Sequence, residues 1–415
     1  MMAAERKKNF SCTALVPERG GMIQYAVQTH EDVTQMDLQE LREQINEIDR
    51  ELVDLYLRRM DTARAIGAWK RENGKQVYDP ARERQLLDRV AEQAGEENET
   101  GVRALFSFLM SQSRTRQLLD EKQQSAVGET IRQSLARTPQ LFPEKAAVAC
   151  QGTDGAYSQQ ACERIFRHPE ITYFKTFSDV FEAIESGRCR YGILPIENSL
   201  AGSVNSVYDL MAQHRFHIVR SARIKIDHTL LALPGTREED IREVWSHEQA
   251  IHQCSNYLSR HQEWQVNACT NTAAAARMVA ESGRKDVAAI SSVHCADLYG
   301  LKCVDAGIQN NSNNHTRFIC ISRDAEIYPG ADRTSLMLSL PNRPGELYRI
   351  LGLFNAQGIN LTKLESRPMP GRDFEFMFCF DLESSVYSPS FYRLMDTLEV
   401  SVEEFTWLGS YTELA

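Results

Sequence analysis

The sequence has no hydrophobic run that approaches about 18 residues, so we expect no membrane-spanning helix. Its ten cysteines are scattered and no C-x-x-C pair occurs, so the sequence supports neither a zinc site nor a disulfide framework and fits a reducing cytoplasm. The net charge of −10 argues against broad binding to nucleic acids or anionic membranes. The sequence also shows neither G-x-G-x-x-G nor a P-loop, so a nucleotide site is poorly supported.

A length of 415 residues with 42% hydrophobic and 25% charged residues suggests two to four ordinary globular domains. The first 36 residues are polar and lack an apolar core of signal-peptide length, which predicts a disordered extension; Met36 is a candidate start residue. The patterns that follow predict an all-α unit over 37–128, a linker over 129–145, an α/β unit over 146–325 and an α+β unit over 333–415.

Three long helices are expected in the first unit. Apolar residues recur at spacings of three and four from Asp37 onward, and this stripe turns polar at Arg59. The first helix should end at Asn73-Gly74, the second should begin at Asp79-Pro80, and the third should cover about 101–127.

The charges on the first helix suggest a ligand site. Arg59 and Lys70 are eleven residues apart on nearly the same face, about 16 Å along the axis, so they could bracket one small ligand. Arg42 lies about 25 Å further back and could reach that ligand only from a second subunit. For any one of these residues alone, solvated helix charge is the ordinary explanation.

This unit resembles the all-helical chorismate mutase family through Leu41-Arg42-Glu43, Val77-Tyr78-Asp79, Arg82-Glu83 and Ser113-x-x-x-Gln117. The resemblance implies a homodimer in which Lys70 and Gln117 donate to the ether oxygen of chorismate and Glu83 bonds the ring hydroxyl. The rearrangement to prephenate is pericyclic and needs positioning and charge stabilisation, but no nucleophile. The implied chorismate site consists of Arg42, Arg59, Lys70, Asp79, Arg82, Glu83, Ser113 and Gln117.

The middle unit alternates apolar strands with helices, and Ser, Thr or Asn stand where strands give way to helices. Examples are the strand 146–150 with the loop 151–158, and the strand-to-turn element 192–199. Such sites present hydroxyls and free N–H groups to an anion. Helix capping explains one such site, whereas several in succession suggest a cleft between two α/β lobes.

A second polar cluster, Asn313-Asn314-His315-Thr316-Arg317-Phe318, runs into the apolar stretch 319–321. An unpaired charge is costly at the mouth of a buried strand, so Arg317 is expected to have an anionic partner or ligand. Taken by itself, the string favours a loop-end arginine that bonds the carbonyls of its own chain.

The middle unit resembles prephenate dehydratase through Asp154–Ser158, Pro195–Ser199, His247–Ala250 and Thr316–Phe318. The resemblance implies a two-lobed fold like that of periplasmic binding proteins, with Thr316 donating to the leaving hydroxyl and Arg317 holding a substrate carboxylate. The family usually has a hydroxyl residue where this chain has Ala156, which leaves only a backbone N–H at that position. The implied prephenate site consists of Ala156, Tyr157, Ser158, Glu197, Asn198, Ser199, Thr316, Arg317 and Phe318.

The last unit shows the order βαββαβ, which fits a ferredoxin-like fold. Its segments 341–347 and 364–368 resemble the ACT amino-acid-binding domain, which implies phenylalanine as a feedback inhibitor at a subunit interface. A purely structural dimerisation module is the alternative. The implied effector site consists of Gly345, Glu346, Leu347, Glu365, Ser366, Arg367 and Pro368.

Taken together, the motifs resemble bifunctional chorismate mutase–prephenate dehydratases over roughly residues 37–415. The expected partners are chorismate, prephenate and phenylalanine in a cytoplasmic homodimer or higher homo-oligomer, with no nucleic acid, membrane, metal or cofactor. Two alternatives stay open. The chain is a non-catalytic binding protein that uses the two-lobed cleft, or only one of the two activities survives.

Overall fold

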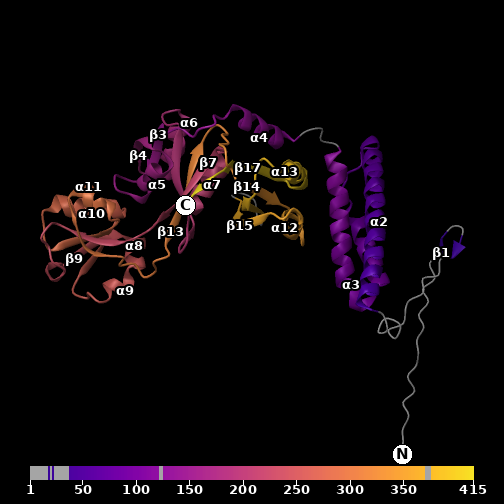
Figure 1. Cartoon of the computed structure of the whole chain (residues 1–415), viewed down its shortest axis with the longest axis horizontal. Helices are drawn as coiled ribbons and strands as arrows, with labels where there is room; N and C mark the ends of the chain where they lie inside the picture. The colour runs from indigo at the N-terminus through magenta and orange to yellow at the C-terminus, as the bar shows by residue number, and fades with distance from the viewer. Residues whose placement is uncertain (1–16, 19–20, 23–36, 121–124, 370–374) are drawn as a thin grey trace, which may run out of the picture. The chain divides into compact units, whose positions relative to one another are not determined.

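A computed structural model of the protein describes residues 17–18, 21–22, 37–120, 125–369 and 375–415 (Figure 1). The chain divides into two compact units, Met1–Asp120 and Glu121–Ala415. Most of the extension expected over 1–36 lies outside the described residues. Within it, β1 (Pro17–Glu18) and β2 (Gly21–Met22) pair antiparallel.

Two long helices, α2 (Leu38–Glu72) and α3 (Pro80–Leu119), lie side by side in the first unit (Figure 1). The start of α2 after Asp37 and its end at Asn73 confirm the sequence prediction. Asp79 caps α3 by accepting a hydrogen bond from the backbone N of Arg82 at 3.0 Å, also as predicted. The second and third expected helices meet at Gly95, whose φ of 73° interrupts the helical path, and α3 ends at Leu119 rather than near 127.

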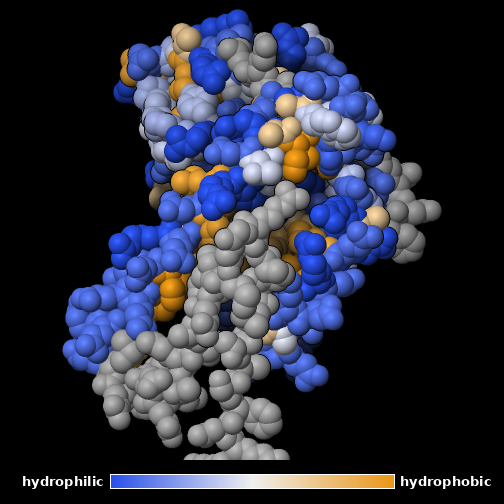
Figure 2. Space-filling view, turned by 90° about the vertical axis from the view of Figure 1, so that its right-hand side faces the viewer, coloured by the Kyte–Doolittle hydropathy of each residue, from blue (hydrophilic) through white to orange (hydrophobic). Residues whose placement is uncertain are grey.

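The first unit buries little of its own apolar surface. Only Ala63 and Gly67 of α2 are buried. In the apolar stripe of α2, Leu41 is half-buried, and the other five residues are each more than half exposed: Leu38, Ile45, Ile48, Leu52 and Leu55. In the space-filling view, hydrophobic residues reach the surface in several patches among hydrophilic ones (Figure 2). Exposed apolar surface of this extent on a helix marks a face that another chain or element covers.

The second unit contains two α/β lobes. The first lobe has a sheet of order β18-β7-β13-β5-β3-β4, with β6 paired to β5. Its strands are β3 (Lys145–Gln151), β4 (His168–Phe174), β5 (Tyr191–Asn198), β6 (Gly202–Ser203), β7 (His217–Lys225), β13 (His315–Ser322) and β18 (Glu413–Leu414). Its helices are α5 (Tyr157–Ile165), α6 (Phe177–Glu185) and α7 (Asn205–His214).

The second lobe has a sheet of order β10-β9-β11-β8-β12. Its strands are β8 (Thr229–Ala232), β9 (Glu243–His247), β10 (Gln265–Cys269), β11 (Val287–Ser291) and β12 (Lys302–Ala306). Its helices are α8 (Glu248–Gln253), α9 (Ser255–Leu258), α10 (Thr272–Ser282), α11 (His294–Tyr299) and the 3-10 helix η1 (Glu238–Asp240).

The chain passes between the lobes twice, at 226–228 and at 307–314, which confirms the expected two-lobed architecture. The loop after β3 also bridges them. Gly155 has a φ of 86°, and a Cβ added there would lie 2.7 Å from Sγ of Cys295 in the second lobe. A glycine at this position therefore lets the loop approach the second lobe closely.

The C-terminal elements form the expected βαββαβ unit, with an antiparallel sheet of order β15-β16-β14-β17. The elements are β14 (Arg333–Leu340), α12 (Glu346–Ala356), β15 (Asn360–Pro368), β16 (Phe376–Glu383), α13 (Pro389–Ser401) and β17 (Glu404–Tyr411).

This C-terminal sheet is covered on both faces. One face packs on α12 and α13, and the other contributes Met337, Cys379 and Leu408 to a core shared with the first lobe. The approach is close at Gly409, where an added Cβ would lie 2.2 Å from the backbone oxygen of Ile218. Beyond β17 the chain continues into β18, which pairs with β7 of the first lobe.

The linker expected over 129–145 contains a helix instead, α4 (Ala126–Arg137), capped by Ser125. Ile131 of α4 is fully buried in the core of the C-terminal sheet unit. The sequence signal is Val127, Ile131 and Leu135 at a spacing of four, which places three apolar residues on one helical face. Polar residues surround this short stripe, so the segment also fits a linker.

Because Ile131 belongs to a core, we expect Ile131→Ala to lower the free energy of unfolding of the second unit by about 2–5 kcal/mol. The control is Leu141→Ala, since Leu141 is 82% exposed and its truncation should cost less than about 0.5 kcal/mol. Denaturant unfolding of the full chain, followed by circular dichroism, measures both. Equal stability of the two variants would show that α4 is a tether and not part of the core.

Candidate functional site

A cavity of about 490 Å³ lies between the two lobes and is lined by residues of both. It collects residues from all four motifs that the sequence singled out, including His247, Gln249 and Ala250 of the third. The expected site residues found in its wall are Ala156, Tyr157, Ser158, Asn198, Thr316 and Phe318.

Thr316 has the geometry of a hydrogen-bond donor to the cavity. It is 9% exposed, and Nδ2 of Asn198 donates to its Oγ1 at 2.9 Å. The Asn198 amide is itself oriented, because its Oδ1 accepts from the backbone N of Leu200 at 3.0 Å and of Ala201 at 2.9 Å. Since Oγ1 already accepts a bond from Asn198, the hydroxyl hydrogen of Thr316 is free to point toward a ligand.

The hydrogen bonds continue from Thr316 into the second lobe. Nδ2 of Asn198 also donates to Oδ1 of Asn314 at 2.8 Å, and Nδ2 of Asn314 donates to Oε1 of Gln253 at 3.1 Å. Nε2 of His228 lies 2.8 Å from the same Gln253 oxygen. A continuous polar chain therefore links both lobes behind the cavity, through residues that are all largely or fully buried.

His228 lines the cavity and is 2% exposed. An amide oxygen can only accept, so Nε2 of His228 carries the hydrogen, and Nδ1 is left as an acceptor with no partner among the described residues. Burial lowers the pKa of His228 below its ordinary value, against smaller opposing effects of Gln253 and Asp227. The neutral ring therefore keeps one unused acceptor, the buried Nδ1.

Glu197, Ser199 and Arg317 are not in the cavity wall, unlike their neighbours in sequence. In the β5–β13 pair, Thr316 is opposite Asn198 and Arg317 is opposite Glu197, and successive side chains of a strand point to opposite faces. Arg317 therefore turns away from the cavity and forms an ion pair with Asp381 of the C-terminal sheet. Its expected role as a clamp for a substrate carboxylate does not fit this placement, although the anionic partner expected for it is present.

Ser199 closes the loop instead. Its Oγ donates to the backbone oxygen of Asn313 at 3.1 Å and accepts from the backbone N of His315 at 3.0 Å. These two bonds fix the segment that leads into β13, the strand that carries Thr316. Ser199 itself is not in the cavity wall.

The polar groups of the loop after β3 are used within the chain. The backbone N of Ala156 donates to the Thr153 oxygen at 3.1 Å, so the N–H expected to be available there is occupied. The Tyr157 hydroxyl donates to the backbone oxygen of Asp227 at 2.6 Å, and burial raises the Tyr157 pKa. Ser158 donates to the Gln151 oxygen at 2.7 Å. This loop shapes the wall rather than donating to a ligand.

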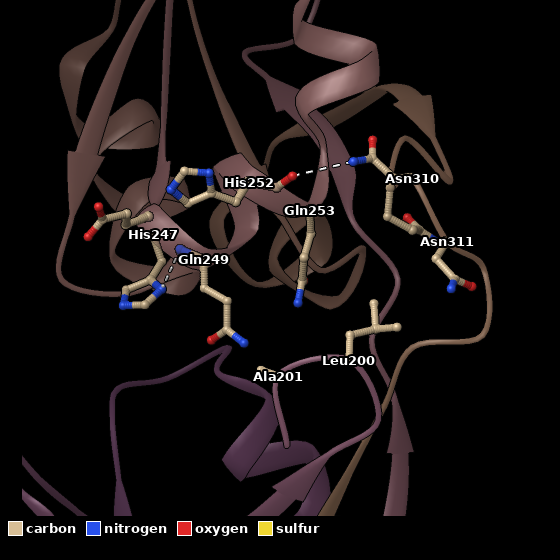
Figure 3. Close-up of a pocket in the computed structure, with 10 residues that line it drawn as sticks. Leu200, Ala201, His247, Gln249, His252, Gln253, Asn310 and Asn311 are labelled. Carbon is tan, nitrogen blue, oxygen red and sulfur yellow. Dashed lines mark hydrogen bonds between the residues drawn. The ribbon is translucent and has the colours of Figure 1, made fainter. Parts of the chain in front are cut away.

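A second cavity of about 690 Å³ shares Ala201, His247, Gln249 and Gln253 with the first. Figure 3 shows Gln249 and Gln253 on one helix, both pointing toward the loop that carries Leu200 and Ala201. The two cavities therefore form one cleft whose outer part is framed by α8. Sequence reasoning assigned no role to Gln249, Gln253, Asn314 or His228, although the spacing of four between the two glutamines marks a shared helical face.

The first unit brings part of its expected site together. Nη1 of Arg59 donates to the backbone oxygen of Leu109 at 2.7 Å and to Oγ of buried Ser113 at 2.5 Å. Gln117 packs on Gly67, where an added Cβ would lie 2.8 Å from its Cγ, and its Oε1 is buried without a partner among the described residues. Lys70 donates to the backbone oxygen of Val77 at 2.7 Å.

The remaining residues of that set lie at its margin. Glu83 forms an ion pair with Arg114, which sequence reasoning did not single out, and Asp79 caps α3. Arg82 and Arg42 are exposed. Because α2 is continuous, Arg42 stays about 25 Å from Arg59 along its axis and does not reach the Arg59 site of its own chain.

The two C-terminal motifs make different contacts. Gly345 has a φ of 88° at the start of α12, Glu346 accepts from Nε of Arg349 at 2.9 Å, and Leu347 packs on the core of this unit. Glu365 and Arg367 face the first lobe, where they bond Ser203 at 2.7 Å and Asp209 at 2.8 Å. Ser366 and Pro368, on the opposite face of β15, are exposed.

Three family models match successive parts of the chain. Residues 41–118 match chorismate mutase type II, residues 148–326 match prephenate dehydratase, and residues 334–385 match the ACT domain. Among the described residues, no helix is long and apolar enough to cross a membrane, and no cluster of three or more His, Cys, Asp or Glu side chains is placed to hold a metal ion.

Two curated relatives illustrate the range of similarity. The bifunctional chorismate mutase/prephenate dehydratase of Escherichia coli is 30% identical over 382 residues, covering 89% of this chain and 95% of the relative. An arogenate dehydratase/prephenate dehydratase of Arabidopsis thaliana is 37% identical over 284 residues, covering 64% of this chain and 72% of the relative.

Solved structures match the second unit. The prephenate dehydratase of Arthrobacter aurescens in complex with L-Phe has a TM-score of 0.59 and 27% identity, covering 64% of this chain and 89% of that one. A protein described as a novel type of quorum quenching acylase, GqqA, also has a TM-score of 0.59, with 32% identity and coverage of 64% and 97%. Proteins with two different reported activities, an acylase and a dehydratase, therefore share this fold. The fold alone does not identify the reaction, which has to be inferred from the residues of the site.

The lowered pKa of His228 predicts a pH dependence of stability. Its folded pKa lies below the ordinary value of 6.5, so the stability is present above that value and is lost as the pH falls through the folded pKa. We expect the thermal unfolding midpoint to fall between pH 7 and pH 5, and less steeply in His228→Gln. The exposed His168→Gln serves as the control and should match the parent slope. Parallel slopes in all three proteins would contradict a buried neutral His228.

Proposed function

The chain belongs to the family of bifunctional chorismate mutase/prephenate dehydratases, and from that membership we propose which residues carry each reaction. The enzyme serves phenylalanine biosynthesis: it rearranges chorismate to prephenate, then removes carbon dioxide and water from prephenate to give phenylpyruvate, under feedback control by phenylalanine through its ACT domain. We assign the mutase to the α2–α3 unit, the dehydratase to the two lobes, and effector binding to the C-terminal sheet unit.

Thr316 is the proposed donor to the hydroxyl group that leaves prephenate. When the bond between the ring and the carboxylate breaks, carbon dioxide leaves and the electron pair of that bond moves into the ring. The C–O bond breaks as the hydroxyl takes a proton from solvent and departs as water, which completes the aromatic ring. A hydrogen bond to that oxygen lowers the barrier, and Thr316 supplies it from a largely buried position in the cavity wall. A threonine hydroxyl is a weak acid, so it acts as a donor held by Asn198 rather than as a free proton source.

The single observation that carries this assignment is the 2.9 Å bond from Asn198 to Oγ1 of Thr316 in the cavity wall. It directs the threonine hydrogen toward the ligand and places the two residues on one face of the β5–β13 pair. The side-chain amide of Gln249 can donate to the carboxyl or carbonyl groups of prephenate, whereas the unused acceptor of His228 suits only a donor such as ordered water.

We expect Thr316→Ala to lower dehydratase kcat by at least about 100-fold while mutase activity stays at the parent value, because the two sites lie in separate units. Purified protein supplied with chorismate, with prephenate and phenylpyruvate followed over time, measures both reactions. Loss of both activities in a folded variant contradicts the assignment to units, and no turnover by the parent protein contradicts the enzyme. Arogenate, the substrate named for the plant relatives, is a useful third substrate.

For the mutase, the α2–α3 unit supplies cations and hydrogen-bond donors, and a pericyclic reaction needs positioning but no nucleophile. Arg59, held by Ser113, is the proposed clamp for one carboxylate of chorismate. Lys70 and Gln117 are the proposed donors to the ether oxygen, and Gln117 has a buried polar atom still without a partner. Glu83 is positioned by Arg114 to bond the ring hydroxyl.

We propose that the mutase unit is a homodimer that completes its site with Arg42 of the partner subunit. Two observations support it: the apolar stripe of α2 is exposed in the single chain, and Arg42 is about 25 Å from its own Arg59. A second copy would cover the stripe and bring an arginine to the open side of the site.

Co-expression of Arg42→Ala and Lys70→Met chains tests the shared site. Each variant alone should lack mutase activity, whereas a mixed dimer holds one intact site and should restore up to about a quarter of the parent activity in a random mixture. The matched control pairs Lys70→Met with Arg59→Met. Each site takes its Arg59 and its Lys70 from one and the same subunit, so every site of this mixed dimer still carries one of the two substitutions and stays inactive. Dimers of the first pair that stay inactive would show that Arg42 does not act across subunits.

Phenylalanine is the proposed effector of this chain at the ACT unit, with Gly345–Leu347 and Glu365–Pro368 as its candidate contacts. The related dehydratase of Arthrobacter aurescens, solved in complex with L-Phe, supports this assignment. The described cysteines are all free thiols, which is compatible with the proposed cytoplasmic location.

A further inference from the structure

The face of the β5–β13 pair that turns away from the cavity is occupied by charges. Asn198 and Thr316 point into the cavity, and the next residues along each strand, Glu197 and Arg317, form the cross-strand pair on the reverse side. Arg317 lies 3.5 Å from Glu197, and its side chain is 11% exposed. The catalytic face and this charged face therefore share the same two backbones.

A second cross-strand pair, from the C-terminal sheet, meets the first. Lys363 of β15 is in register with Asp381 of β16. Lys363 reaches Glu197 at 3.0 Å, and Asp381 forms an ion pair with Arg317. We call these four residues the charge square, because opposite charges alternate around it. The Lys363 and Asp381 side chains are 7% and 9% exposed, so solvent screens their pairs little.

The C-terminal sheet also touches the cavity wall itself. Nζ of Lys363 donates to Oγ of Ser203 at 2.7 Å, and Ser203 donates to Glu365 at 2.7 Å. Ser203 lines the cavity, and its strand β6 pairs with Glu197 and Asn198 of β5. Lys363 and Glu365 of β15 therefore both bond Ser203, a residue that lines the cavity.

We infer that Lys363 and Asp381 of the C-terminal sheet are positioning residues of the dehydratase site, acting through Glu197 and Arg317 on Asn198 and Thr316. This inference rests on the proposed role of Thr316. The effect is geometric: the hydroxyl of Thr316 must be held within a few tenths of an ångström of the leaving oxygen, and the charge square clamps the strands that carry it from the reverse side.

A different ion pair between the same two parts of the chain supplies a matched control. Arg367 of β15 binds Asp209 of α7 at 2.8 Å, and the Asp209 side chain is 54% exposed. This pair also joins the C-terminal sheet to the first lobe, but Asp209 is neither in the cavity wall nor on the strands that carry Thr316. If the pairs served only to attach the sheet, the two should be equivalent.

The test compares steady-state dehydratase kinetics of the full chain in Lys363→Met, Lys363→Arg, Asp381→Asn, Asp209→Asn and Thr316→Ala. We expect Lys363→Met and Asp381→Asn to lower kcat by about 10-fold to 100-fold, with KM changed by less than about threefold, because the leaving-group donor acts in the transition state. Lys363→Arg keeps the charge and should recover most of kcat. Asp209→Asn and the mutase activity of every variant should stay at parent values.

The outcomes separate this inference from the proposed function. A kcat within about twofold of the parent in both Lys363→Met and Asp381→Asn overturns it, as does an equal loss in Asp209→Asn, which would indicate attachment alone. Thermal unfolding checks each variant, and if one fails to fold, the other decides by the same criterion. Retained activity in Thr316→Ala would instead overturn the assignment of Thr316, whatever the charge square shows.

Discussion

The pairing of β5 with β13 is the constraint on which the dehydratase site depends. One register places Thr316 beside Asn198 and Arg317 beside Glu197, and the alternation of side chains along a strand sends the two pairs to opposite faces. The neutral pair faces the cavity, where Thr316 is the proposed donor, and the charged pair faces protein, where partners neutralise it. A slip of one residue would exchange these faces and bury an unpaired arginine in the cleft.

The same alternation explains why motif residues differ in their roles. The sequence correctly indicated the two-lobed unit, the βαββαβ unit, the start of the first helix after Asp37 and the cap at Asp79, and the motifs that it singled out include Thr316 and Asn198, which line the cavity. A run of adjacent motif residues does not reveal which members face a cavity until strand bounds and register are known. The sequence predicts an anionic partner or ligand for Arg317, and the resemblance implies a substrate carboxylate; in the structure the anion is Asp381, which lies 64 residues further along the chain.

Contacts across large sequence distances account for the other differences. His228, Gln253 and Asn314 join one polar chain only because the two lobe crossings meet, and no local pattern marks that meeting. Ile131 occupies the core of a unit whose first strand begins about 200 residues later. The sequence around α4 alone does not show that partner, so it is equally compatible with a linker. Local periodicity predicts which face of an element is apolar, but it does not name the surface that covers it.

The two active units differ in how each is completed. In the mutase unit, the apolar stripe of α2 is exposed and Arg42 cannot reach the Arg59 site of its own chain. A second copy of the same chain would cover the stripe and supply that arginine. The dehydratase lobes are covered from within the chain, by a C-terminal sheet whose core merges with that of the first lobe and whose last strand joins its sheet. A regulatory unit bound this closely need not move far to affect the reaction. A change in β15 reaches Ser203 through one hydrogen bond and Glu197 through one ion pair, both at the rim of the strands that hold the donor.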